Sequence, residues 1–162
     1  GSVVAVHEQI PDRRWFGNMP ELFIEKRGEG VDVLIERIEQ AANQYPYHRE
    51  YWIWPGPNSN TFTAWISRAV PELGLDLPPT AIGKDFLGKA WVATAPSGHG
   101  WQWSMFGLLG VTVSQIEGFE LNILGLTFGI DPNPFAIKLP LIGRIDIPIL
   151  DIFTAPSTIQ EQ

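Results

Sequence analysis

Hydrophobic residues recur with helical spacing in two stretches of the first half of the chain. In the second stretch they lie at Phe62, Ile66, Ala69 and Val70, and in the first at Val31, Leu34, Ile35, Ile38, Ala41 and Ala42. This spacing is typical of helices that bury one face. We therefore predict a helix over residues 31–42 that ends before Pro46, and a second over about 60–69 that stops near Pro71.

After Ala90 the helical spacing gives way to short apolar runs separated by Gly or Pro. These runs predict strands at Trp91–Ala93, Trp101–Trp103, Val111–Val113, Phe119–Ile123, Leu126–Phe128 and Phe135–Ile137. Shorter β-prone runs precede the helices at Val3–Val6 and Leu22–Ile24, and Tyr47–Trp54 is expected to be extended. The predicted fold is α+β, with two main helices in the N-terminal half packed on a mostly antiparallel β-sheet. The tail, residues 147–162, is expected to lie extended over the surface.

The predicted strand at Trp101 has aromatic side chains on one face and polar side chains on the other. Trp101 and Trp103 share one face of the predicted sheet, and Gln102 and Ser104 share the other. Because large rings favour burial, we expect the aromatic face to pack against the core. Two alternatives remain: the rings line a groove for a sugar or an amphiphile, or the glycine-rich strands over 106–142 form a lipid-contacting patch.

Composition narrows the function classes. The 162 residues, 44% of them hydrophobic, suffice for a single domain spanning 1–162. Gly1 and Ser2 look like a cloning remnant, and we expect the chain to be cut from a longer, membrane-anchored protein. The net charge of −7 and the lack of a basic stripe argue against nucleic-acid binding. The chain has no Cys, its three His are far apart and no H-E-x-x-H occurs, so we predict neither a metal nor a cofactor.

The segment that leads into the second helix carries the candidate chemistry. Asn58, Ser59 and Asn60 are all good N-cap residues. The Ser59 hydroxyl is expected beside the positive end of a helix dipole, where either an ordinary cap or a nucleophile would suit. A nucleophile needs a base, and His7, His48 and His99 are the candidates. His48 is the best placed of them, because the segment that follows it is expected to pass beside the second helix.

Several segments carry a resemblance to a known family. They are Pro11–Gly17, Trp54–Phe62, Leu75–Asp85, Ala95–Gly98 and Phe106–Gly110, and they resemble the bacterial family called domain of unknown function 3750. Members of that family look like envelope proteins with an N-terminal hydrophobic anchor. In addition, the run from Asn58 to Phe62 is similar to the N-C-N-x-F motif of permuted papain-like (NlpC/P60-related) proteins. In those proteins the Cys caps a helix and the catalytic His lies on an upstream strand.

The resemblance implies a papain-like variant of the α+β fold and a hydrolase of amide or ester bonds. It implies that the protein works in the bacterial cell envelope on the periplasmic side, associated with the membrane or the cell wall. Ser59 would replace the usual Cys nucleophile, with His48 or an upstream histidine as base. Asn58 and Asn60 would orient groups or donate to an oxyanion. The residues assigned to substrate binding are Trp54, Thr61, His99 and Trp101. The alternative is a non-catalytic envelope module that binds a lipid, a glycan or a partner protein.

Overall fold

The computed structural model describes residues 1–5, 14 and 17–148, which form two α-helices, a short 3-10 helix and one β-sheet. The helices are α1 (Val31–Asn43), α2 (Ser59–Ala69) and the 3-10 helix η1 (Pro71–Leu73). The strands are β1 (Val92–Thr94), β2 (Trp101–Met105), β3 (Leu109–Ser114), β4 (Gly118–Ile123), β5 (Leu126–Pro132), β6 (Phe135–Leu139) and β7 (Gly143–Asp146). The α+β class is confirmed. Within the described residues, no helix combines the length and the apolar composition needed to cross a bilayer.

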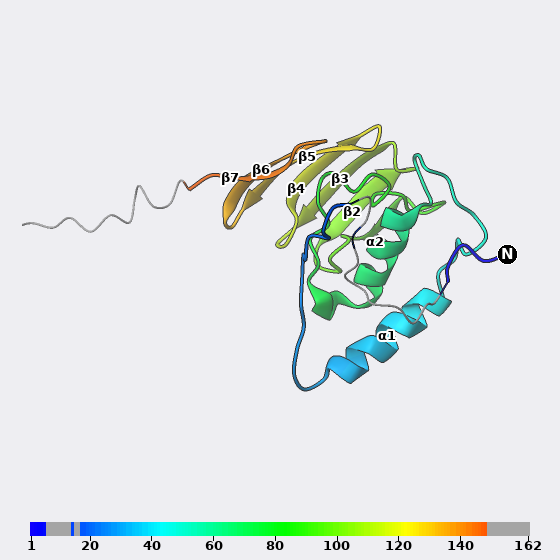
Figure 1. Ribbon diagram of the computed structural model, residues 1–162. Helices are drawn as coiled ribbons and strands as arrows, with labels where there is room; N and C mark the ends of the chain where they lie inside the picture. The colour runs from blue at the N-terminus through cyan, green and yellow to red at the C-terminus, as the bar shows by residue number, and fades with distance from the viewer. Residues whose placement is uncertain (6–13, 15–16, 149–162) are drawn as a thin grey trace, which may run out of the picture.

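The sheet is a seven-stranded antiparallel meander in which each strand pairs with its neighbours in sequence. Figure 1 shows α2 lying against one face of this sheet and α1 on the outer side of α2, while none of the described helices covers the other face. The two helices are joined by a hydrogen bond from Trp65 Nε1 to the Ala41 carbonyl (2.8 Å). The rings of Tyr45 and Phe62 also meet edge to face, with their centroids 5.0 Å apart.

The helices and the later strands agree with their predictions, whereas the early strands do not. Both helices start and end within about one residue of their predicted bounds, and all six predicted strands are present. The described parts of Val3–Val6 and Leu22–Ile24 form no strand. The extended prediction for Tyr47–Trp54 was wrong, because the chain turns there, with the Glu50 N–H bonded to the Tyr47 carbonyl (3.1 Å). Val6 and most of the predicted C-terminal tail, residues 149–162, lie outside the described residues.

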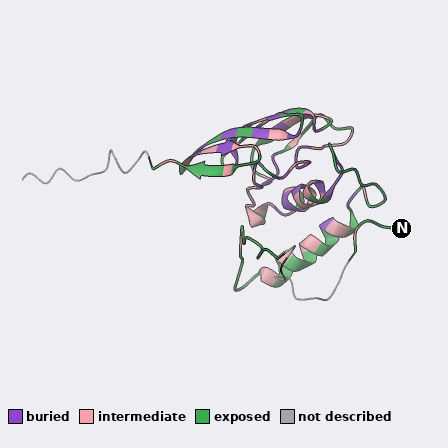
Figure 2. Cartoon of the chain, turned by 45° about the horizontal axis from the view of Figure 1, so that its top comes forward, coloured by how far each residue is buried: buried purple, intermediate pink, exposed green. Residues whose placement is uncertain are grey.

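The two faces of the sheet have the opposite orientation to the one expected. Gln102 and Ser104 are completely buried, whereas Trp101 is 46% exposed. Figure 2 shows buried and exposed residues alternating along the strands. The expectation that the aromatic face packs against the core was therefore wrong. The physical reason is that α2 and residues 75–90 cover the other face and bring charged partners for its polar groups.

These partners form a buried polar layer between the sheet and its cover. The Glu120 carboxylate pairs with Lys84 Nζ (2.6 Å) and with Lys138 Nζ (3.0 Å). The Asp85 carboxylate accepts one hydrogen bond from the Gln102 amide and one from the Asn122 amide, both 2.5 Å long. Burial raises the pKa of Asp85. Burial alone would lower the pKa of Lys84, but the attraction of Glu120 and Asp85 outweighs it and raises that pKa. Charges buried in this way are tolerated only when they are paired and hydrogen-bonded.

Candidate functional site

The first turn of α2 is closed by Asn58. Its Oδ1 accepts hydrogen bonds from the backbone N–H groups of Asn60 (3.0 Å) and Thr61 (3.1 Å). In return, Thr61 Oγ1 accepts one from the backbone N–H of Asn58 (3.0 Å), which completes a capping box. Asn58 is therefore the N-cap, and the alternative in which Ser59 caps the helix is wrong.

A loop from the cover of the sheet fixes this helix start. Asn58 Nδ2 donates to the carbonyls of Ile53 and Ile82, both at 3.0 Å. Thr61 Oγ1 donates to the Gly83 carbonyl at 2.8 Å. Gly83 has a φ of +99°, and a Cβ at this position would lie 2.4 Å from the Asn58 amide. Only glycine therefore lets the loop approach closely enough to hold the cap.

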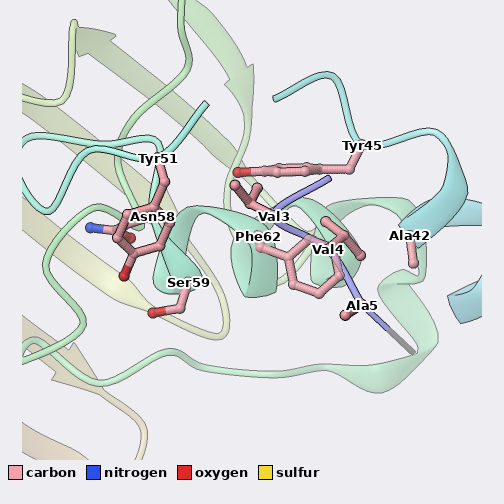
Figure 3. A pocket seen from close by; sticks show the side chains of 9 residues that line it. All are labelled: Val3, Val4, Ala5, Ala42, Tyr45, Tyr51, Asn58, Ser59 and Phe62. Atoms are coloured by element: carbon pink, nitrogen blue, oxygen red, sulfur yellow. The ribbon is translucent and has the colours of Figure 1, made fainter. Parts of the chain in front are cut away.

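Ser59 is the first residue of α2, and its side chain is exposed at a pocket of about 270 Å³. Figure 3 shows the hydroxyls of Ser59 and Tyr51 at one end of this pocket and Ala42 at the other. Within the described part of the chain, no hydrogen bond engages the Ser59 hydroxyl or its backbone N–H. The residues that line the pocket are mostly apolar: Val3, Val4, Ala5, Ala42, Tyr45, Tyr51, Asn58, Ser59 and Phe62.

Among the described residues that line the pocket, none is acidic or basic. The helix end and the hydroxyls of Tyr51 and Ser59 supply polarity there. Burial, and secondarily the neighbouring Tyr47, raises the pKa of Tyr45 to about 12, so this phenol is neutral at physiological pH. The free N–H groups at a helix N-terminus carry partial positive charge. The site can therefore accept an uncharged acyl group and stabilise negative charge that develops beside Ser59.

The asparagines next to Ser59 differ in whether a side-chain amide hydrogen remains free to donate. Both amide hydrogens of Asn58 are engaged by the carbonyls of Ile53 and Ile82. Asn60 Nδ2 donates one hydrogen to Ile82 (2.9 Å), which leaves the other for a ligand. The donors that remain beside Ser59 are thus its own backbone N–H and one hydrogen of Asn60.

The two described histidines, His48 and His99, are not part of the pocket lining. His48 is exposed, and its Nδ1 is 3.4 Å from the Tyr45 carbonyl. Because a carbonyl only accepts hydrogen bonds, a hydrogen bond here would require the proton of His48 on Nδ1. The backbone carbonyl of His48 accepts a hydrogen bond from the Val3 N–H (2.8 Å), which ties its turn to the segment that lines the pocket. His7 lies outside the described residues.

The structure does not bring the predicted substrate-binding residues together at Ser59. Thr61 is buried and belongs to the cap. Trp54 is exposed, and its Nε1 donates to the Leu124 carbonyl in the β4–β5 turn (2.9 Å). His99 lies in the β1–β2 turn, with Nδ1 bonded to the Ser97 carbonyl (3.1 Å), and Trp101 lies on the uncovered face of the sheet. None of these four side chains lines the Ser59 pocket.

Sequence reasoning missed most of the pocket walls. Phe62 follows Ser59 by three positions on α2, and this helical spacing was visible in the sequence. Val3, Val4 and Tyr45 reach the pocket only through the tertiary fold, so no local sequence pattern could predict them. The described residues form no group of three or more side chains arranged to hold a metal ion.

The fold and the pocket together define an α+β protein with a free serine at the capped start of a helix. A family model described as "Protein of unknown function (DUF3750)" matches residues 1–86, more than half of the chain. The chain belongs to this family, as its sequence segments predicted. The match includes both helices and every residue of the pocket lining, and it ends before β1. No curated protein and no solved structure matches the chain.

Proposed function

We propose that this protein is a papain-like hydrolase of amide or ester bonds in which Ser59 is the nucleophile. We propose further that it works in the bacterial cell envelope, on the periplasmic side. The observation that carries the proposal is the separation of two tasks at the start of α2. Asn58 caps the helix, and this leaves the Ser59 hydroxyl and N–H free at the mouth of a pocket.

The surroundings of Ser59 support an acyl-transfer reaction. The resemblance to permuted papain-like proteins puts Ser59 in the position of their Cys. In this chain, Ser59 begins a helix that packs on an antiparallel sheet. The pocket walls are uncharged and apolar, which suits an acyl chain or an apolar side chain next to the bond that is cleaved.

The proposed reaction proceeds through an acyl-serine. Ser59 Oγ bonds to the acyl carbon of the substrate while its proton passes to a base, and the carbonyl oxygen becomes an oxyanion. The backbone N–H of Ser59 and the free amide hydrogen of Asn60 stabilise that oxyanion. When the tetrahedral intermediate collapses, the C–N or C–O bond breaks and the base returns the proton to the leaving amine or alcohol. Water then hydrolyses the acyl-serine by the same steps.

The base in this proposal is a histidine upstream of Ser59. In the tautomer that donates its Nδ1 proton to the Tyr45 carbonyl, His48 would accept the serine proton on Nε2. His7 is the other upstream histidine, and it lies outside the described residues. We expect the base to be identified by comparing the His48→Ala and His7→Ala variants in the labelling experiment below.

The first test is labelling by a fluorophosphonate probe, which reacts covalently with activated serines. The chain is expected to be labelled, Ser59→Ala is expected to lose the label, and Thr63→Ala, on the same helix outside the pocket, is expected to keep it. Absence of labelling in the unmodified chain would overturn the proposal.

A second test uses the lack of cysteine in the chain. Ser59→Cys introduces a single thiol, and Thr63→Cys is its matched control. Because the helix end stabilises a thiolate, the pKa of the thiol at position 59 is expected below the ordinary value of about 8.5 and below that at position 63. Alkylation rates with iodoacetamide across pH give both pKa values. Equal pKa values would count against an activating site.

A second candidate is a non-catalytic envelope module that binds a lipid, a glycan or a partner protein. Two observations favour it: neither His48 nor His99 lines the Ser59 pocket, and a large apolar face of the sheet is uncovered. Retention of both the unmodified chain and Ser59→Ala on peptidoglycan or on liposomes, without fluorophosphonate labelling, would select this candidate over the hydrolase.

A further inference from the structure

The uncovered face of the sheet is apolar from one edge to the other. One row of paired residues crosses all the strands from β2 to β7: Trp101, Val113, Phe119, Ile130, Ile137 and Ile145. Between 43% and 50% of each of these residues is exposed, apart from Ile137, which is half-buried. A parallel row runs from Trp103 through Val111 and Leu121 to Phe128. No residue of β2–β6 that points to this face is charged.

A face of this kind needs an apolar partner, because contiguous apolar surfaces of this extent are rare on monomers in water. A protein partner is usually recognised through a polar rim and about one hydrogen bond per 100–200 Å² of interface. The strands of this face offer few side chains for such directional contacts: Thr94 on the edge strand β1 and the indole N–H groups of Trp101 and Trp103. The acyl chains of a lipid form no hydrogen bonds, so they fit this surface better than a protein partner.

The turns at one end of the sheet give a second, independent observation. Phe106, Leu124 and Leu141 have φ values of 54°, 55° and 65°, and in the described residues they are the only non-glycine residues with positive φ. They lie in the β2–β3, β4–β5 and β6–β7 turns, which the meander brings to the same end, and they are between 49% and 78% exposed. Asn or Gly would adopt this backbone conformation with less strain than a large apolar residue. Strained and exposed apolar side chains at three neighbouring turns indicate that these side chains contact something.

The other end of the sheet is polar. Its three turns expose the polar side chains of His99, Gln115 and Asn133. The sheet therefore has an apolar end and a polar end, as expected of a protein that meets a membrane with one end and water with the other.

We infer that this face and the three apolar turns are a docking surface for a phospholipid bilayer, with Phe106, Leu124 and Leu141 inserted among the acyl chains. The chain carries a net charge of −7 and the docking face carries none, so the bilayer it fits is zwitterionic rather than anionic. This inference deepens the second candidate function by naming its ligand and its surface, and it does not rest on the chemistry of Ser59.

The test is flotation of the full 162-residue chain with phosphatidylcholine vesicles at low and high salt. We expect binding that salt leaves unchanged, because only charge interactions are screened. The triple variant Phe106→Asn, Leu124→Asn and Leu141→Asn removes the apolar tips at positions where Asn suits the backbone, so the fold is expected to persist. Each tip is expected to contribute about tenfold to the partition coefficient, so the triple variant binds far more weakly.

Two controls separate this inference from the others. Val33→Asn removes an exposed apolar side chain from α1, away from the sheet, and is expected to bind vesicles like the unmodified chain. Ser59→Ala is expected to bind normally, whether or not the hydrolase proposal holds. Three results would overturn the inference: no flotation, binding only to anionic vesicles at low salt, or a stable dimer in sedimentation that excludes vesicles, since a second copy would then cover the face.

Discussion

Two adjacent residues at the start of α2 have separate tasks, and this separation can be measured. Asn58 forms the cap and also donates to two carbonyls of neighbouring loops, whereas the Ser59 hydroxyl has no bonded partner among the described residues. We expect Asn58→Ala to lower the free energy of unfolding by about 2 kcal/mol or more, because the cap is lost and the Ile53 carbonyl loses its side-chain donor, whereas the Ile82 carbonyl keeps that of Asn60. Ser59→Ala is expected to change it by less than about 0.5 kcal/mol.

Urea unfolding followed by circular dichroism measures both changes. Asn60→Ala is a useful intermediate control, since Asn60 makes only one side-chain hydrogen bond, to Ile82. If Ser59→Ala proved as destabilising as Asn58→Ala, the Ser59 side chain would have a structural role, and the separation of tasks would be wrong.

The second prediction at this scale concerns Tyr45, whose ring lies between α1 and α2. Burial raises its pKa to about 12 in the folded state, against about 10 in the unfolded chain. Between these values the unfolded state loses the phenol proton while the folded state retains it. The contribution of this residue to stability is thus complete below pH 10 and is lost as the pH rises towards 12.

The measurement is the phenolate absorbance during an alkaline titration. Tyr45→Phe is expected to remove an ionisation step near pH 12. A titration in which Tyr45→Phe removes an early step would show that the ring is accessible to water.

At the scale of elements, periodicity predicted which elements form but not which face of the sheet is buried. The helical spacing of α1 and α2 and the short apolar runs of the strands are local, so they could be seen in the sequence. Strand alternation also separated Trp101 from Gln102 correctly. It could not tell which side is covered, because the cover comes from Lys84 and Asp85 in a loop and from Arg68 on α2. Hydrogen bonds between segments far apart in the sequence therefore determine which face of the sheet is buried.

The candidate site was predictable to the same limited degree. The three successive N-cap residues Asn58, Ser59 and Asn60 indicated where α2 starts and which residues could form the site. Only the structure assigns the cap to Asn58, since this depends on the carbonyls of Ile53 and Ile82 lying within reach. The walls formed by Val3 and Val4 come from more than fifty positions upstream, beyond any local pattern.

The buried polar layer gives the prediction at the element scale. Glu120 on β4 is the shared partner of Lys84 and Lys138, and both ammonium groups are almost completely buried. Glu120→Gln removes the carboxylate paired with Lys84 and leaves Lys138 with Asp76 alone, so we expect a loss of about 3–5 kcal/mol in the free energy of unfolding. Guanidinium unfolding measures the loss.

Glu72→Gln is the matched control. Glu72 pairs with Arg37 at the exposed junction of η1 and α1, where water screens the charges. No measurable change in stability is expected for this variant. If Glu120→Gln behaved in the same way, the sheet would not depend on its ionic layer.

At the scale of the whole molecule, α2 runs between the two ends of the sheet. Near its N-terminus, Trp54 bonds to the Leu124 carbonyl in an apolar turn. Near its C-terminus, Arg68 Nε bonds to the Thr94 carbonyl (3.0 Å), and η1 packs on the β1–β2 turn through Pro71 and Gly98. The Ser59 pocket therefore lies at the same end of the molecule as the apolar turns. Docking of these turns on a bilayer would bring the pocket towards the lipid and its substrates.

This arrangement leads to the last prediction, which concerns the orientation of the bound protein. A single environment-sensitive dye is attached either to Ser59→Cys, at the apolar end, or to Gln115→Cys, at the polar end, because the chain has no other cysteine. On phosphatidylcholine vesicles that contain a quencher in the acyl region, we expect the dye at position 59 to be quenched more strongly than the dye at position 115, because the three inserted turns lie at the end of the molecule that carries position 59. Equal quenching at both positions would mean that the sheet lies flat on the bilayer. Quenching at position 115 alone would mean that the polar end leads, and the strained apolar turns would then need another explanation.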